Sequence, residues 1–233
     1  MRSDRATPHV SSGTHGRLPF LSIPCVIRMR LPTVSALLVL TGTMVRSMWC
    51  SIMAGNVPCS VAQGIVEAKA TQILDTKPKA HCVVIDAGNR NIYVPGLGGD
   101  IVMELTFDPV TGTVSPNAPG EVATRAGAGP RHLNFHPNGK FAYLITETTA
   151  TIGTFAVDPA LGTLKELQFV DTNEYKEQPA ASDIHVTPDG RFLYGAERKT
   201  SMLIGYKIDP DKGTLTQIGR FPTEKTRRGS NSK

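Results

Sequence analysis

Short apolar runs separated by turn residues recur between residues 131 and 170. Residues 133–135 (LNF) alternate apolar and polar side chains, HPNG follows as a turn, and 140–147 (KFAYLITE) is rich in residues that favour strands. Two further runs, 151–157 (TIGTFAV) and 164–170 (LKELQFV), are separated by the turn DPALGT. The pattern predicts four short antiparallel strands.

The same pattern occurs three times, with copies that begin at 81–93 (HCVVIDAGNRNIY), 131–143 (RHLNFHPNGKFAY) and 182–194 (SDIHVTPDGRFLY). Spacings of 50 and then 51 residues separate three kinds of equivalent position, namely Tyr93, Tyr143 and Tyr194, then Asp108, Asp158 and Asp209, and then Gly112, Gly162 and Gly213. A period of about 40–50 residues with several strands in each copy is typical of β-propeller blades. We therefore predict an all-β fold of four-stranded antiparallel blades. A β-sandwich with similar hairpins is the less favoured alternative.

The number of copies limits how much of a propeller this chain contains. Three blades fit between residues 81 and 229, and residues 55–74 resemble the third and fourth strands of another blade. The chain is thus expected to contain three to three and a half blades. Because propellers close into rings that protect their edge strands, we expect either a truncated propeller or self-association through open blade edges.

The net charge of +5 is confined to the beginning of the chain. Residues 1–66 contain six Arg, no Lys and one acid, Asp4, whereas the remaining 167 residues balance 19 basic against 19 acidic side chains. Since the basic residues do not line a folded face interleaved with aromatic residues, no nucleic-acid partner is expected.

We expect residues 1–53 to be a leader, signal-like or disordered, followed by a partial propeller at 54–229 and a tail at 230–233. The apolar stretch 31–45 resembles the hydrophobic region of a signal sequence and is short for a stable membrane span. The expected location is the cytoplasm, or the periplasm or exterior if the leader is a genuine signal. A transit peptide or a misassigned start codon would give a similar composition.

Candidate functional residues appear where the three copies differ. The first strands open with His81, with Arg131 and His132, and with Asp183 followed by His185; beyond the second strands come Glu147, Glu197 and Arg198. Because the first and second strands of a blade are antiparallel, these positions meet at one end of each blade. The sequence therefore predicts a polar site at one mouth of the central channel.

The residue types at this mouth suit an anionic or carbonyl substrate. Arg131 and Arg198 can bind a carboxylate or phosphate and stabilise an oxyanion, and Glu147 and His81 are candidates for proton transfer. The alternative is that these charges form an ion-pair network between blades. No cysteine or histidine spacing indicates a metal site.

Three segments carry a resemblance to a known family: 129–147 (GPRHLNFHPNGKFAYLITE), 182–209 (SDIHVTPDGRFLYGAERKTSMLIGYKID) and 222–229 (PTEKTRRG). They resemble the lactonase family of seven-bladed propellers, which includes the propeller-type 6-phosphogluconolactonases and carboxy-cis,cis-muconate cyclase. The resemblance covers about residues 54–229. Arg227 stands where the family usually has proline, and the family continues into further blades.

The resemblance implies hydrolysis of a small anionic sugar lactone, 6-phosphogluconolactone, to 6-phosphogluconate in the pentose phosphate pathway, with no metal or organic cofactor. A lactone-forming cyclase and a non-catalytic fragment that binds an anionic ligand are the alternatives. The resemblance implies catalytic roles for His81, Arg131, Glu147 and Arg198. We expect substrate-binding roles for His132, Asp183, His185 and Glu197.

Overall fold

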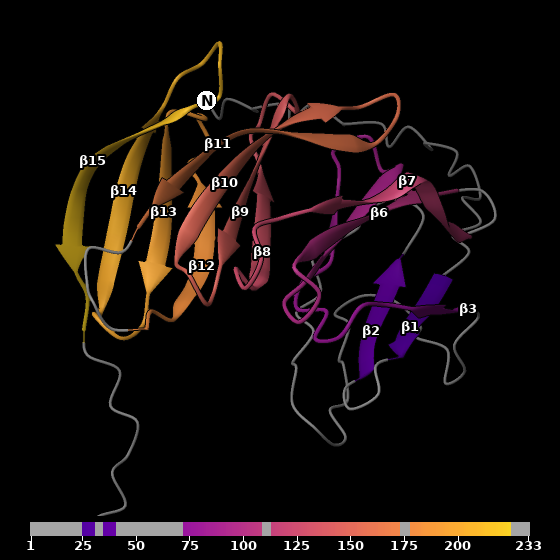
Figure 1. The fold of residues 1–233 in the computed structure, drawn as a ribbon. Helices are drawn as coiled ribbons and strands as arrows, with labels where there is room; N and C mark the ends of the chain where they lie inside the picture. Colours follow the sequence, from indigo (N-terminus) through magenta and orange to yellow (C-terminus); the bar gives the residue numbers. More distant parts are fainter. Residues whose placement is uncertain (1–24, 31–34, 41–71, 109–112, 173–177, 225–233) are drawn as a thin grey trace, which may run out of the picture.

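The computed structural model describes residues 25–30, 35–40, 72–108, 113–172 and 178–224, in which every helix or strand element is a strand (Figure 1). Blade 1 consists of β4 (Val84–Ile85), β5 (Asn91–Gly96), β6 (Ile101–Phe107) and β7 (Val114–Ala123). Blade 2 consists of β8 (Pro130–Phe135), β9 (Phe141–Thr146), β10 (Thr151–Asp158) and β11 (Thr163–Asp171). Blade 3 consists of β12 (Ala181–Val186), β13 (Phe192–Glu197), β14 (Met202–Ile208) and β15 (Leu215–Pro222). The prediction of all-β, four-stranded antiparallel blades is confirmed.

The repeat extends to the backbone conformation of the turns. The turn between the first and second strands has a positive φ of 58°, 71° and 72° at the equivalent residues Asn89, Gly139 and Gly190. A left-handed backbone costs most L-residues about 1–2 kcal/mol, which explains why Asn and Gly occupy these turns. At Gly190 a second constraint applies, because an added Cβ would lie 2.6 Å from His136 Cε1 in the turn of blade 2.

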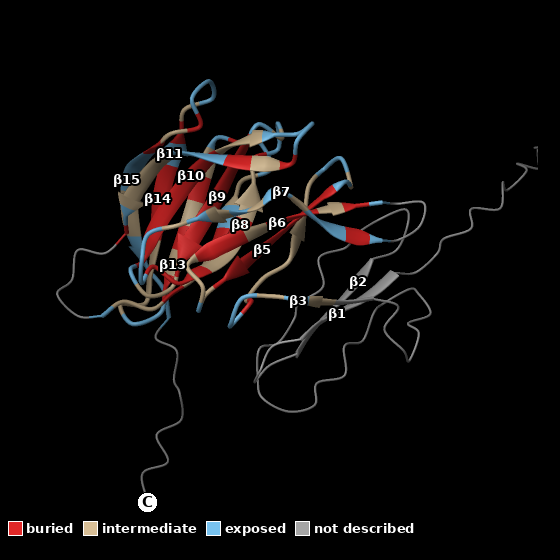
Figure 2. Ribbon diagram, turned by 45° about the vertical axis from the view of Figure 1, so that its right-hand side comes forward, coloured by how far each residue is buried: buried red, intermediate tan, exposed pale blue. Residues whose placement is uncertain are grey.

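The hydrophobic core lies between successive blades, and Figure 2 shows its buried residues concentrated in the middle strands. Between blades 2 and 3, Tyr143 and Ile152 pack against Ile204 and Tyr206, all four being at most 1% exposed. The hydroxyl of Tyr143 donates a hydrogen bond to the Gly213 carbonyl at 3.0 Å. The inner strands β8 and β12 lie side by side, so the same packing brings the innermost edges of these blades together.

Blade 3 presents an apolar face that no other described blade covers. Phe221 and Ile218 are 45% and 48% exposed. Tyr194, which occupies in blade 3 the place of Tyr143 in blade 2, is only part-buried, and its ring centroid lies 6.5 Å from that of Phe221. The equivalent face of blade 2 is covered by blade 3, so this surface has the character of a blade interface.

A separate three-stranded sheet precedes the blades. In it, β1 (Cys25–Arg30) pairs with β2 (Ser35–Leu40) in antiparallel fashion and with β3 (Gln72–Asp75) in parallel. Both β1 and β2 come from residues expected to be a leader. Most of the expected half blade at 55–74 lies outside the described residues. Its last residues belong to β3, whose parallel pairing has no counterpart in an antiparallel blade.

The first strand of blade 1 is shorter than the repeat predicts. It begins at Val84, whereas the aligned copies suggest a start at His81. In β5, Pro95 accepts a hydrogen bond from the His81 amide at 2.9 Å but has no N–H of its own to return one. The ladder therefore breaks at this point, and His81 lies in an extended segment ahead of the strand.

No helix in the described ranges is long and apolar enough to cross a membrane.

Candidate active site

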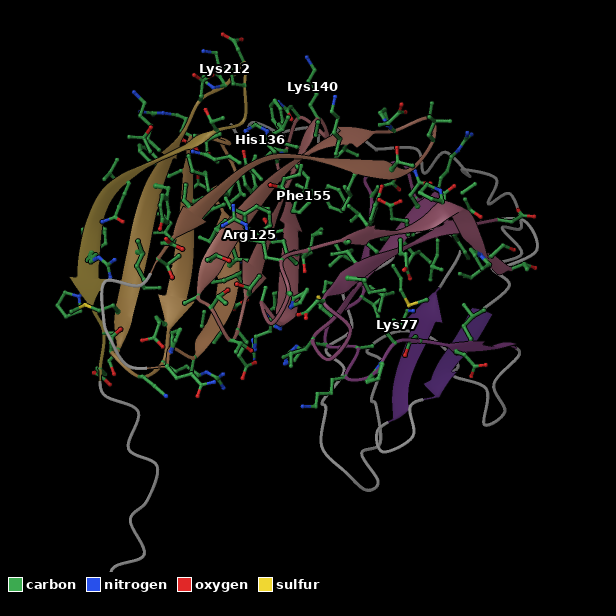
Figure 3. All side chains as sticks on the ribbon, viewed as in Figure 1. Lys77, Arg125, His136, Lys140, Phe155 and Lys212 are labelled. Atoms are coloured by element: carbon green, nitrogen blue, oxygen red, sulfur yellow. The ribbon has the colours of Figure 1, made fainter. Side chains whose placement is uncertain are left out.

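The predicted site residues lie at one end of the blades, where each second strand turns into the third. Leu97, Glu147 and Arg198 occupy equivalent positions, and their amides donate to carbonyls just ahead of the first strands at 3.0, 2.8 and 3.2 Å. The beginning of each first strand is thereby held beside the end of the second. The turns at the other end of the blades include His136 and Lys140, which Figure 3 shows at the top of the view.

Glu147 bridges two arginines from neighbouring blades. Arg131 Nε donates to Glu147 Oε2 at 2.7 Å, and Arg198 Nη2 donates to Glu147 Oε1 at 2.8 Å. The side chains of Arg131, Glu147 and Arg198 are 14%, 30% and 36% exposed. Burial raises the pKa of Glu147, but the two guanidinium groups outweigh burial and hold its pKa below the usual range. Glu147 is therefore ionised, and it forms an ion pair with each of the two arginines.

Backbone carbonyls fix the two arginines further. Arg131 Nη1 donates to the Ser182 carbonyl and also contacts His132 Nε2 at 3.2 Å, while Arg198 Nε donates to the Ala180 carbonyl at 3.1 Å. These carbonyls were not among the predicted site groups, because residue type reveals nothing about a main-chain acceptor. Because Arg131 also reaches across to blade 3, the ion-pair network joins blades 2 and 3 as well as forming the site.

His81 lies next to this cluster, with its ring centroid 5.0 Å from that of His132. Burial, followed by the nearby charge of Arg131, lowers the pKa of His81 to about 4. Its Nδ1 atom is buried and has no hydrogen-bond partner in the described part of the chain. At neutral pH, His81 is thus uncharged and lies beside His132, close to the charge of Arg131.

His132, Asp183 and His185 form a second chain of contacts at the same end. His132 Nδ1 lies 2.8 Å from Asp183 Oδ1, and His185 Nε2 lies 3.0 Å from Asp183 Oδ2. Burial raises the pKa of Asp183, but its hydrogen bonds with the two histidines outweigh burial and lower the pKa. His185 is 65% exposed and forms the outer edge of the cluster.

Glu197, expected to bind substrate, holds a turn of its own blade. One carboxylate oxygen accepts from the amides of Ala180 and Lys199, and the other accepts from the amide and hydroxyl of Thr200. Its side chain is buried, with the residue only 4% exposed. Thr146, at the equivalent position in blade 2, makes similar contacts within its hairpin, which indicates a structural role for this position.

In the part of the chain that the structure describes, no group of three or more His, Cys, Asp or Glu side chains could hold a metal ion. Cys82 is half-buried, and burial raises the pKa of its thiol. A protonated thiol in this setting is a weak nucleophile.

The fold and the cluster together define a protein built of β-propeller blades, with a polar cluster at the end where each second strand turns into the third. The chain belongs to the lactonase family of seven-bladed β-propellers, whose family model matches residues 59–228.

Among curated relatives, the 6-phosphogluconolactonase of Pectobacterium carotovorum is 38% identical over 172 residues, which are 73% of this chain and 51% of the relative. That of Serratia proteamaculans is 36% identical over 170 residues, or 72% of this chain and 51% of the relative. The chain therefore spans about half the length of these relatives.

Solved structures of similar proteins agree with this fold. The periplasmic gluconolactonase of Pseudomonas aeruginosa superposes with a TM-score of 0.59 at 31% identity, covering 62% of this chain and 41% of that one. A protein from Lactobacillus plantarum superposes with a TM-score of 0.58 at 31% identity, covering 62% of this chain and 42% of that one.

Proposed function

We propose that this chain carries the catalytic site of a lactonase that hydrolyses a sugar lactone, 6-phosphogluconolactone, to 6-phosphogluconate. The relatives named 6-phosphogluconolactonase and the structural similarity to a gluconolactonase support a lactone substrate. The proposed reaction belongs to carbohydrate metabolism, where it would serve the pentose phosphate pathway.

One observation carries the proposal: two arginines share Glu147, and this ion-pair cluster lies near a histidine that is neutral at physiological pH. A guanidinium has five N–H donors. Arg131 uses three of them and Arg198 two in hydrogen bonds to described residues. The remaining donors are available to bind a phosphate or the oxyanion of an ester, and Glu147 holds both groups in place beforehand.

In the proposed reaction, a water molecule attacks the carbonyl carbon of the lactone while neutral His81 accepts its proton. Negative charge moves to the carbonyl oxygen, where the arginines stabilise it. The tetrahedral intermediate collapses, the bond to the ring oxygen breaks, and protonated His81 returns a proton to that oxygen. The products are an alcohol and a carboxylic acid, which ionises in water.

His81 suits the role of base better than Glu147. A general base must be in its proton-accepting form and retain affinity for a proton. Glu147 faces two guanidinium groups that lower its pKa below that of an ordinary carboxylate, so its proton affinity is weakened. His81 is neutral above a pKa of about 4 and, among the described residues, forms no ion pair with these arginines.

Hydrolysis of 6-phosphogluconolactone by the purified chain tests the proposal, with Arg131→Ala as the site variant and Arg90→Ala as the control. Arg90 is exposed in the turn between β4 and β5, at the other end of blade 1. We expect catalysis above the spontaneous rate in the wild type and in Arg90→Ala, and a loss of about a hundredfold or more in Arg131→Ala. Equal rates in wild type and Arg131→Ala would refute this mechanism. Binding of 6-phosphogluconate without turnover would instead indicate an anion-binding fragment.

A further inference from the structure

His132 lies between Arg131 and Asp183, and each contact uses a different ring nitrogen. Its Nε2 lies 3.2 Å from Arg131 Nη1, and its Nδ1 lies 2.8 Å from Asp183 Oδ1. Only 15% of its side chain is exposed. Since Arg131 belongs to blade 2 and Asp183 to blade 3, the ring is held across the junction of the two blades.

The chemistry of the partners defines the proton positions on this ring. An arginine side chain can only donate hydrogen bonds, so Nε2 of His132 must accept from Arg131. Nδ1 must then carry the proton and donate it to Asp183, and a carboxylate at this position favours that tautomer. A doubly protonated ring would place an N–H of His132 against an N–H of Arg131. The contact to Arg131 therefore needs neutral His132 in its Nδ1–H form.

Asp183 is itself held in a fixed orientation. Besides His132, its Oδ1 atom accepts the Ile184 amide at 3.0 Å, and its Oδ2 atom contacts His185 Nε2 at 3.0 Å. Both oxygens are thus engaged from β12. An oriented and ionised carboxylate is what the Nδ1–H form of His132 requires.

We propose that His132 and Asp183 are a positioning pair that sets the orientation of the Arg131 guanidinium. Asp183 holds His132 in the neutral Nδ1–H tautomer, and the Nε2 atom of His132 then accepts a hydrogen bond from Arg131. This inference rests on the proposed lactonase function, in which Arg131 contacts the substrate. The pair acts through Arg131, and neither member takes part in bond breaking.

The role follows from how the guanidinium is held. Glu147 contacts Arg131 at Nε, and the Ser182 carbonyl and His132 both contact Nη1. Nη1 carries two hydrogens, so the Ser182 carbonyl and His132 each accept one of them, and loss of His132 leaves one Nη1 hydrogen without its acceptor. Small errors in the placement of a catalytic group cost large factors in rate, so loss of the His132 acceptor is expected to lower kcat.

Two substitutions at His132 separate the two contacts. In His132→Gln, the side-chain oxygen reaches the place of Nε2, so an acceptor for Arg131 is kept and the donor to Asp183 is lost. In His132→Asn, the amide nitrogen reaches the place of Nδ1, so the donor to Asp183 is kept and the acceptor for Arg131 is lost. If His132 only tied blade 3 to blade 2, Asn would preserve function better than Gln, because it keeps the contact to Asp183. If His132 positions Arg131, Gln would preserve function better, because it keeps the acceptor.

We expect His132→Asn to lower kcat about ten- to hundredfold with little change in KM, and His132→Gln to stay within about threefold of wild type. Wild-type kcat in His132→Asn, or a larger loss in His132→Gln than in His132→Asn, would overturn the proposal. If the Gln variant does not fold, Asp183→Asn replaces it. An uncharged Asn no longer fixes His132 in its Nδ1–H form, so kcat is expected to fall by several-fold with little change in KM, and wild-type kcat in Asp183→Asn would contradict the proposal.

The tautomer gives a readout that does not depend on turnover. In 15N spectra of histidine-labelled full chain, the His132 signals are assigned by their absence in His132→Asn. We expect a protonated Nδ1 and a bare Nε2 near neutral pH. A protonated Nε2 would contradict the proposal even in an active protein. If the chain shows the expected tautomer but has no lactonase activity, the proposed function is refuted, while the contact between His132 and Arg131 is supported. Failure of the proposed function and failure of the positioning pair are therefore distinguishable.

Discussion

Removing the charge of Glu147 should destabilise the protein, because this one carboxylate compensates two arginines. Glu147→Gln keeps the shape of the side chain but leaves Arg131 and Arg198 without a counter-ion and places an NH2 group against one of them. Two charge-assisted hydrogen bonds of 2.7 and 2.8 Å are weakened or lost. Each such bond is worth about 1.5–3 kcal/mol in a buried setting.

The exposure of the three side chains reduces this figure. Glu147 is 30% exposed and Arg198 36%, so solvent screens part of the interaction. We expect a loss of about 2–3 kcal/mol in the free energy of unfolding. For an ordered region of this size, the loss corresponds to a fall of roughly 4–12 °C in Tm.

Urea and thermal unfolding of Glu147→Gln measure the effect, with Glu166→Gln as the matched control. Glu166 is exposed on β11, and its substitution should change stability by less than about 0.5 kcal/mol. If the two variants have the same stability, the bridge between blades 2 and 3 contributes nothing, and the reasoning about a preorganised arginine pair fails.

Three further predictions concern the turns, the titration of His81 and the exposed apolar face of blade 3. Gly190→Ala should lower the free energy of unfolding in urea by about 1–3 kcal/mol more than Gly139→Ala, because both residues have a left-handed φ but only Gly190 approaches His136. Equal losses in the two variants would contradict the packing between these turns. The folded-state pKa of His81, about 4, lies below the unfolded value of 6.5, so the unfolded chain binds more protons between these pH values and stability falls as pH drops from about 6.5 to 4. The loss should be about 1–2 kcal/mol once screening of a part-exposed ring is allowed for, and should be absent in His81→Asn; a loss that persists there would assign it to other groups. We propose that the exposed apolar face of blade 3 supports self-association, in which case Phe221→Ser should shift the sedimentation profile towards the monomer, and an unchanged profile would contradict that role.

The blades could be predicted from the sequence because each turn has a local chemical signature. The HPNG and TPDG turns place Gly139 and Gly190 where the backbone is left-handed. Such signals lie within a few residues of the structure that they specify. The same regularity allowed Arg131 and Glu147 to be placed at the same end of the blade, since β8 and β9 are antiparallel.

Other features depended on contacts distant in the sequence. The lowered pKa of His81 results from burial and from the charge of Arg131 on β8, and no local pattern encodes it. The parallel pairing of β3 with β1 likewise joins residues more than forty positions apart, and it was not predicted.

Glu197 is the instructive case among the candidate residues. Its charge and its place near Arg198 suggested contact with substrate, whereas its carboxylate is used by the backbone of its own turn. The signal was present in the repeat: Thr146 stands at the equivalent position of blade 2, and a residue that caps a hairpin in one copy is a candidate to cap it in the next. Differences between copies point to a site only after such shared turn contacts are set aside.

The dependence of kcat/KM on pH for hydrolysis of 6-phosphogluconolactone, corrected for the spontaneous reaction, tests the central claim most directly. With neutral His81 as the base, kcat/KM should stay level from neutral pH down to about 5 and fall to half near pH 4, because protonation removes the proton acceptor. The fall should disappear in His81→Ala, together with most of the activity. A midpoint near 6.5, or a profile unchanged in His81→Ala, would contradict the account.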